Sequence, residues 1–174
     1  MEFNLAHTIN LLNRTPKVLR ALLEGLPSEW INSNEGEETW SPYDVMGHLI
    51  HDEHTDWIPR AKIILEEGES IAFEPFDRFA QFEESAGKSV EELLKVFATL
   101  RHKNIEQLLA MNLTPSDLSR QGQHPALGVV TLAQLLATWV THDHSHIAQI
   151  ARTMARQYQE AVGPWQEYLS VLKK

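Results

Sequence analysis

The sequence predicts an all-α protein, a four-helix bundle built by a single domain over residues 1–174. Apolar residues recur at helical spacing in four long segments, whereas no run of alternating β-branched residues lies between turn dipeptides. Two lengthy connections separate these segments, which is typical of bundles with crossover loops. We also expect a short helix near the C-terminal end, after Gly163-Pro164.

The first long helix is expected between Asn4 and Glu24. Pro16 predicts a kink within it, because an interior proline removes a backbone donor and crowds the preceding turn. Gly25 and Pro27 mark its end.

The second helix has a marked start, since Ser41 suits the capping position and Pro42 suits the first helical position. We expect it to continue to Glu67, where Gly68 ends it. Pro59 predicts a second kink, for the same reason as in the first helix.

The third and fourth helices begin at capping boxes, in which a Ser or Thr stands three residues before a Glu or Gln. They are expected over residues 89–111 and 131–157. The connection over residues 68–88 is unusually long for a compact domain, and such loops often have a function or cross over the bundle. Its four phenylalanines are expected to form core beneath the loop, to line a pocket or to pack a dimer: Phe73, Phe76, Phe79 and Phe82.

Composition excludes several classes of function. The net charge is −9, with 24 acidic against 15 basic residues, so we expect neither nucleic acid nor an anionic membrane surface as a partner. No apolar run approaches the length of a membrane span, and the N-terminus does not resemble a secretory signal. We therefore expect a cytoplasmic protein. Cysteine is absent, so a metal that prefers nitrogen or sulfur must be held by some of the nine histidines.

The strongest chemical signal is the segment His142-Asp143-His144-Ser145-His146. Residues four apart lie on one helix face, so His142 and His146 point the same way and His144 points away. Their face is the apolar one, which makes a shared metal ion a good partner for two inward imidazoles. Histidines satisfied by ordinary hydrogen bonds are the alternative for any such pair.

A third ligand is expected from the second helix. His48 lies near the edge of that helix's apolar stripe, whereas His51 and His54 rotate towards its outer face. Three other histidines stand isolated in the sequence and are interpreted as ordinary residues: His7, His102 and His124.

Two alternative metal schemes agree less well with the sequence. A ferritin-like di-iron bundle needs Glu-x-x-His on two helices, and no such motif occurs. A zinc protease needs His-Glu-x-x-His, but the second position is Asp143, whose shorter side chain holds a base farther from the metal.

Four further polar residues are candidates for work beside a metal. Asp52, Glu53 and Asp143 could act as a general base. Our preferred interpretation is that they accept hydrogen bonds from the imidazoles and fix their tautomer, and Gln149, one turn after His146, could join them.

The chain resembles the DinB/YfiT-like superfamily of helical-bundle proteins. Residues 40–49 (WSPYDVMGHL) resemble the start of the family's second helix, and residues 142–150 (HDHSHIAQI) resemble its H-D-x-x-H-x-x-Q-I segment. Residues 163–169 (GPWQEYL) are similar to a C-terminal element of many members. The resemblance spans essentially the whole chain in order and spacing, and it is the combination of the three short segments that is specific.

The resemblance implies that His48, His142 and His146 form the family's metal triad, with zinc or nickel and open positions for water or substrate. It also implies an up-down-down-up bundle, in which the connection after the second helix is a crossover, and a homodimer.

Three functions follow as hypotheses. Our first is a metal-dependent thiol S-transferase for a small-molecule substrate, in which a low-molecular-weight thiol supplies the sulfur that the cysteine-free chain lacks. The second is a metal-dependent hydrolase. The third is a non-catalytic metal- or ligand-binding protein of a stress response.

Overall fold

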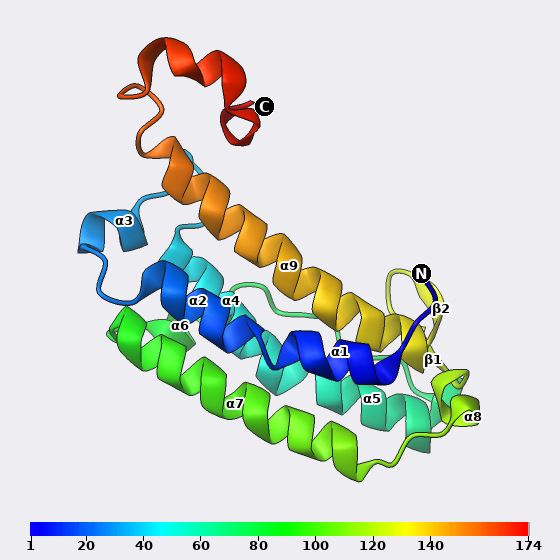
Figure 1. The fold of residues 1–174 in the computed structure, drawn as a ribbon. Helices are drawn as coiled ribbons and strands as arrows, with labels where there is room; N and C mark the ends of the chain where they lie inside the picture. Colours follow the sequence, from blue (N-terminus) through cyan, green and yellow to red (C-terminus); the bar gives the residue numbers. More distant parts are fainter. Residues whose placement is uncertain (174) are drawn as a thin grey trace.

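The computed structural model describes residues 1–173, and four long helical segments form its bundle (Figure 1). The first and fourth run in one direction and the second and third in the other, which is the up-down-down-up order. The prediction of an all-α four-helix bundle is confirmed. The segments are α1 (Leu5–Leu12) with α2 (Thr15–Leu23), α4 (Pro42–Thr55) with α5 (Trp57–Glu66), α7 (Val90–Ala110) and α9 (Leu132–Arg156).

The first two segments are broken rather than kinked, which corrects the sequence prediction. Helix α2 restarts at Thr15 and places Pro16 in its first turn, and α5 likewise has Pro59 in its first turn. Proline is tolerated there because the first backbone N–H groups of a helix have no intrahelical acceptor. Each proline therefore lies in the first turn of a new helix and not in the middle of a continuous one.

The predicted helix starts are confirmed by their capping contacts. Ser41 accepts a hydrogen bond from the backbone of Asp44, whose carboxylate accepts one in return. The same reciprocal pairs occur at Ser89 with Glu92 and at Thr131 with Gln134. These local signals fix where α4, α7 and α9 begin.

The connections contain more structure than the sequence indicated. The crossover after α5 holds a 3₁₀ turn, η1 (Gly68–Ser70), and α6 (Ala80–Ser85), which packs on α4. Short helices occupy two other connections, α3 (Ser28–Asn32) and α8 (Pro115–Leu118), and only α8 has a start that its residues Thr114-Pro115 predict. At the C-terminal end, two 3₁₀ turns replace the expected helix and project from the end of α9 (Figure 1): η2 (Gly163–Tyr168) and η3 (Ser170–Leu172).

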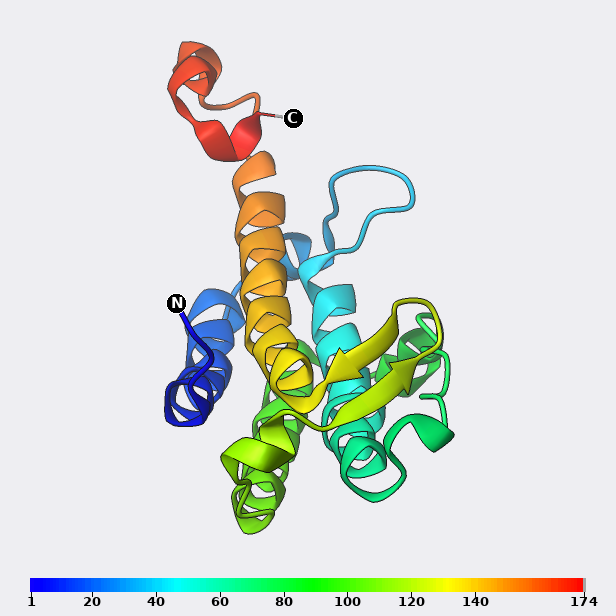
Figure 2. The same ribbon diagram turned by 90° about the vertical axis from the view of Figure 1, so that its right-hand side faces the viewer.

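A β-hairpin lies in the connection between α7 and α9, although the sequence showed no strand pattern. Strand β1 (Gln121–His124) pairs antiparallel with β2 (Gly128–Thr131). Figure 2 shows the hairpin beside the first turn of α9 and alongside α5. The crossover joins it, because the backbone N–H of Phe73 donates to the carbonyl of Gln123 at 2.9 Å. Four-residue strands are too short to show the alternating pattern that predicts a sheet.

The core is divided into two apolar clusters along the bundle. One gathers Leu12, Trp57, Ile105 and Trp139 near the hairpin end, and the other gathers residues such as Leu19, Leu49, Phe97 and Ile150. No helix of residues 1–173 is both long and apolar enough to cross a membrane. A layer of buried polar residues, to which all four segments contribute, lies between the two clusters.

Arg101 of α7 is the centre of that polar layer and is 1% exposed. Its guanidinium donates to Glu53 of α4 at 2.7 and 2.9 Å, and to Asp143 of α9 at 2.6 and 2.9 Å. It also donates to the carbonyl of Leu12 at 3.2 Å. Thr15 of α2 donates to the same Asp143 carboxylate at 2.6 Å. One side chain thus connects all four segments.

Replacing Arg101 with Met should lower the free energy of unfolding by about 3–5 kcal/mol, because two buried carboxylates lose their charge partner. Urea unfolding of the variant measures this change. The control is Lys103→Met on the same helix, where the side chain is exposed and the expected change is within about 0.5 kcal/mol. Equal losses in the two variants would contradict the role assigned to the guanidinium.

Candidate metal centre

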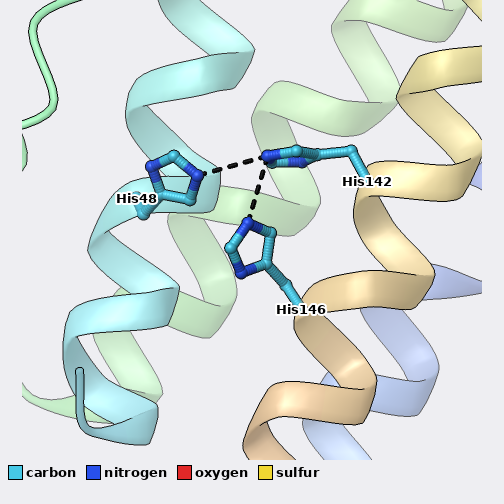
Figure 3. A group of neighbouring side chains, drawn as sticks. All are labelled: His48, His142 and His146. Atoms are coloured by element: carbon cyan, nitrogen blue, oxygen red, sulfur yellow. Dashed lines mark hydrogen bonds between the residues drawn. The ribbon is translucent and has the colours of Figure 1, made fainter. Parts of the chain in front are cut away.

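Three histidine side chains converge between α4 and α9 (Figure 3). The Nε2 atom of His142 lies 3.2 Å from Nε2 of His48 and 3.1 Å from Nε2 of His146. One ligand atom from each side chain lies within 4.8 Å of the other two. Nitrogen atoms about 2.1 Å from one zinc ion would stand at similar separations from each other.

The helices explain the convergence. His142 and His146 are one turn apart on α9 and share a face, while His48 faces them from α4. His144 is exposed and lies off this face, with its Nδ1 2.8 Å from the carbonyl oxygen of Val140, as its position predicted. The sequence therefore identified which histidines meet.

Burial keeps these imidazoles neutral. It lowers the pKa of His48 to about 3, assisted by the neighbouring His146 and His142, and it lowers the pKa of His142 to about 4. The pKa of His146 is also lowered by burial. At neutral pH each ring has one nitrogen lone pair, which is the form that binds metals.

Hydrogen bonds among the three rings cannot pair all three Nε2 atoms with a donor or an acceptor. The Nε2 atom of His142 faces two other Nε2 atoms, and one nitrogen can neither donate to both nor accept from both. A cation at the centre would resolve the conflict, because all three Nε2 atoms could then act as electron-pair donors.

Gln149 fixes one ring in the form that a metal needs. The Nδ1–H of His146 donates to Oε1 of Gln149 at 2.8 Å, which leaves Nε2 free to face the other rings. The sequence placed Gln149 beside His146, and the structure brings them into contact. The Nδ1 atoms of His48 and His142 are buried and have no hydrogen-bond partner within residues 1–173.

Asp52 is the carboxylate nearest the three histidines. Its Oδ2 lies 3.4 Å from Nε2 of His48 and 3.4 Å from Nε2 of His142. The side chain is 2% exposed, and this oxygen has no hydrogen-bond partner in the described part of the chain. Burial raises the pKa of Asp52 to about 9, with smaller contributions from Asp56 and Glu53. A buried carboxyl oxygen without a hydrogen-bond partner, beside two of the three imidazoles, suits a site that binds a cation.

Glu53 and Asp143 are placed differently from Asp52. Both carboxylates bind Arg101, and Glu53 also accepts hydrogen bonds from Trp139 and Asn104. Neither is hydrogen-bonded to an imidazole within residues 1–173. The structure thus separates the acids that the sequence grouped together, leaving Asp52 beside the histidines and the other two in the polar layer.

Arg101 is the important residue that sequence reasoning missed. Its signal was present, since it stands four residues from both Phe97 and Ile105 on the inward face of α7. An arginine on that stripe requires buried acidic partners. Those partners are the acids on the inward faces of α4 and α9.

His51 corrects another prediction, because it is buried rather than outward. The crossover covers that face of α4, and His51 Nδ1 lies 3.0 Å from a carboxylate oxygen of Glu84. Phe76 of the crossover packs edge-on against both His48 and His51, at ring separations of 5.5 and 5.1 Å. Trp40 also packs on His48, with 4.8 Å between the ring centroids.

The other crossover phenylalanines take different positions. Phe73 is core, at 2% exposure, whereas Phe79 and Phe82 are largely exposed. The expectation of core beneath the loop therefore holds for Phe73, while Phe76 forms a wall of the histidine site.

A cleft of about 440 Å³ opens beside the histidines. The residues that line it include His48, Asp52, Arg60, His124 and His142. The hairpin brings His124 to this cleft, so the histidine that stands isolated in the sequence lies next to the site in space. The volume is in the range that binds small organic molecules.

Fold and site together define a helical-bundle protein with a three-histidine candidate metal centre. A model of the DinB superfamily matches residues 11–150. The chain belongs to this superfamily, which confirms the family indicated by the sequence motifs.

Relatives agree with this assignment. The chain is 25% identical over 150 residues to an Oceanobacillus iheyensis protein, covering 86% of this chain and 85% of that one. It is 26% identical over 149 residues to YfiT of Bacillus subtilis, covering 85% and 83%. Both are named "Putative metal-dependent hydrolase". The solved structure of Bacillus subtilis YfiT, titled "a probable metal-dependent hydrolase with an unusual four-helix bundle topology", superposes with a TM-score of 0.75 at 25% identity, covering 88% and 87%.

Replacing Asp52 with Asn should stabilise the metal-free protein increasingly as the pH rises from about 4 to 9. The folded-state pKa is raised, so the unfolded chain loses its proton first, and the wild-type stability falls across this window. The expected gain is up to about 1.4 kcal/mol per pH unit. Urea unfolding at several pH values in the presence of a chelator measures it. A difference between the proteins that is independent of pH would contradict the burial of an unpaired carboxyl.

Proposed function

We propose that His48, His142 and His146 bind one divalent metal ion through their Nε2 atoms. The observation that carries the proposal is the convergence of three neutral imidazoles at 3.1–3.2 Å next to an unpartnered carboxyl oxygen. Zinc or nickel suits such ligands best, because imidazole nitrogen is a preferred donor for both. Three protein ligands leave positions open, as in catalytic rather than structural sites.

Removing one histidine should abolish stoichiometric metal binding. Purified wild-type protein that has not met a chelator should carry about one equivalent of metal by elemental analysis, and His146→Ala should carry little. His144→Ala is the matched control, because it removes an exposed imidazole two residues away and should retain the metal. Equal metal content in His146→Ala and wild type would contradict the proposal.

The reaction that the site supports best is hydrolysis of a small molecule in the adjoining cleft. A bound divalent ion would supply polarisation of a carbonyl and acidification of water. The charge of that ion would lower the raised pKa of Asp52 and ionise its carboxyl group. The carboxylate could then accept the proton that an attacking water molecule releases, because its Oδ2 lies 3.4 Å from two of the ligand nitrogens. Phe76 and Trp40 pack against the His48 ring and shield it from bulk water, and Gln149 holds His146 in the binding tautomer. The names of the relatives support this choice.

Asp52→Asn should lower kcat for metal-dependent hydrolysis by about 10²–10⁴, the usual contribution of a general base. The assay uses a panel of activated esters, with metal content measured on the same samples. His144→Ala is again the control and should retain full activity. A variant that keeps its metal and its kcat would contradict the base role of Asp52.

Thiol S-transfer is the second candidate, and one observation favours it. The chain has no cysteine, and the open side of the site faces a cleft large enough for a small thiol and its acceptor. Here the bound ion would stabilise a thiolate, and Asp52 would take the thiol proton. Monochlorobimane with bacillithiol, mycothiol, glutathione or coenzyme A tests this reaction. Metal-dependent turnover with one thiol, and none with esters, would favour transfer over hydrolysis, and no turnover in either assay would favour a metal- or ligand-binding protein.

A further inference from the structure

A row of polar side chains leads from the histidines along the cleft. His48, Asp52, Asp56 and Arg60 follow one another at intervals of four residues along α4 and α5, and all four line the cleft. The first two belong to the candidate metal centre. The last two lie about two or three helical turns away and have no role in the proposed chemistry.

The Arg60 guanidinium has unused hydrogen-bonding capacity at that far end. The side chain is 10% exposed, and Nη2 pairs with Oδ1 of Asp56 at 2.9 Å. Within residues 1–173 this carboxylate is its one ion-pair partner. The Cζ atom of the Arg60 guanidinium lies over the ring of Phe73, 5.4 Å from its centroid, and this contact holds the guanidinium in place. A guanidinium carries five N–H donors, so most of them remain for a ligand.

His124 provides a second donor beside Arg60. Its Nδ1 accepts hydrogen bonds from the backbone N–H groups of Ala126 and Leu127, both at 3.1 Å. The neutral ring must then carry its proton on Nε2. The His124 ring lies 6.0 Å from the Phe73 ring on which the Arg60 guanidinium also packs, and both side chains line the same cleft. Two donors from different elements therefore line one end of the cleft.

We propose that Arg60 and His124 form a subsite for the anionic group of the substrate, a carboxylate, phosphate or sulfonate, while its reacting group lies at the three histidines. This inference rests on the proposed metal-dependent function. Eight residues of helix separate His48 from Asp56, about 12 Å along the axis. The substrate class is thus a small organic anion whose charged group lies several bonds from the reacting centre.

Charge in the cleft is compatible with an anion. Asp56 is already paired with Arg60, and a divalent ion together with Arg60 outweighs the carboxylates of Asp52 and Asp56. Guanidinium groups bind carboxylates and phosphates through two parallel hydrogen bonds, which gives direction as well as affinity.

Matched hydroxamic acids test the subsite directly. Hydroxamates bind metal ions, so the probes are a series with an alkyl chain of increasing length that ends in a carboxylate or in its methyl ester. Isothermal titration calorimetry of zinc-loaded protein measures each affinity. At one favoured chain length the carboxylate should bind about tenfold more tightly than its ester, the usual size of a charge-assisted hydrogen bond.

Variants assign the preference to named side chains. Arg60→Gln should lose the preference and retain the affinity for the ester. The double variant Asp56→Asn/Arg60→Gln, which does not leave the Asp56 carboxylate without its partner, should do the same. Asp56→Asn alone should increase the preference for the carboxylate over the ester, because Asp56 no longer competes for the Arg60 guanidinium. Arg120→Gln, which removes an exposed arginine, is the control and should behave as wild type.

The outcomes separate this inference from the proposed function. Equal affinity of acid and ester at every chain length, or a preference that persists in the double variant, would overturn the subsite while the metal site stands. Failure of every hydroxamate to bind the zinc-loaded protein would overturn the open metal site and the subsite with it. Unchanged ester affinity in the Arg60 variants shows that they remain folded.

Discussion

The buried guanidinium of Arg101 is the interaction on which the rest of the structure depends. It binds carboxylates from α4 and α9 and a carbonyl at the end of α1. One group on α7 therefore fixes the positions of the other three segments along the bundle axis. Burial alone would lower the pKa of Arg101, but Glu53 and Asp143 raise it above its ordinary value. The paired charges are costly to separate, and a shift of one helix by a turn would separate them. We infer that this layer sets the register of the bundle.

That register positions the histidines. Asp52 and Glu53 are neighbours on α4, and His142 and Asp143 are neighbours on α9. Adjacent residues on a helix point about 100° apart. In each pair one side chain therefore reaches the guanidinium while the other faces the candidate metal centre. The ion pairs of the polar layer therefore also hold the backbone positions next to the candidate metal centre. This explains how the site keeps its shape although some of its nitrogen and oxygen atoms have no hydrogen-bond partner.

Local patterns in the sequence predicted the four helical segments and two of the three clustered histidines, whereas His48 and the order of the helices were indicated mainly by the family resemblance. Capping residues predicted three helix starts, and four-residue spacing identified His142 and His146 on one face. The prolines were recognised, but their effect was not, because whether a helix bends or restarts depends on packing at the break. Long-range contacts were the main omission. Nothing near Glu53 in the sequence shows that its partner is Arg101, and nothing near His124 shows that a hairpin brings it to the cleft.

The most direct test of the metal site is the state of its nitrogen atoms. Long-range ¹H–¹⁵N NMR of the histidine rings, recorded while one equivalent of zinc is added, reports which nitrogen of each ring binds. The structure predicts that the Nε2 resonances of His48, His142 and His146 shift together, with the proton on Nδ1 in all three rings, while His144 is unchanged. Shifts confined to other histidines, or no shift at stoichiometric zinc, would contradict the three-histidine centre.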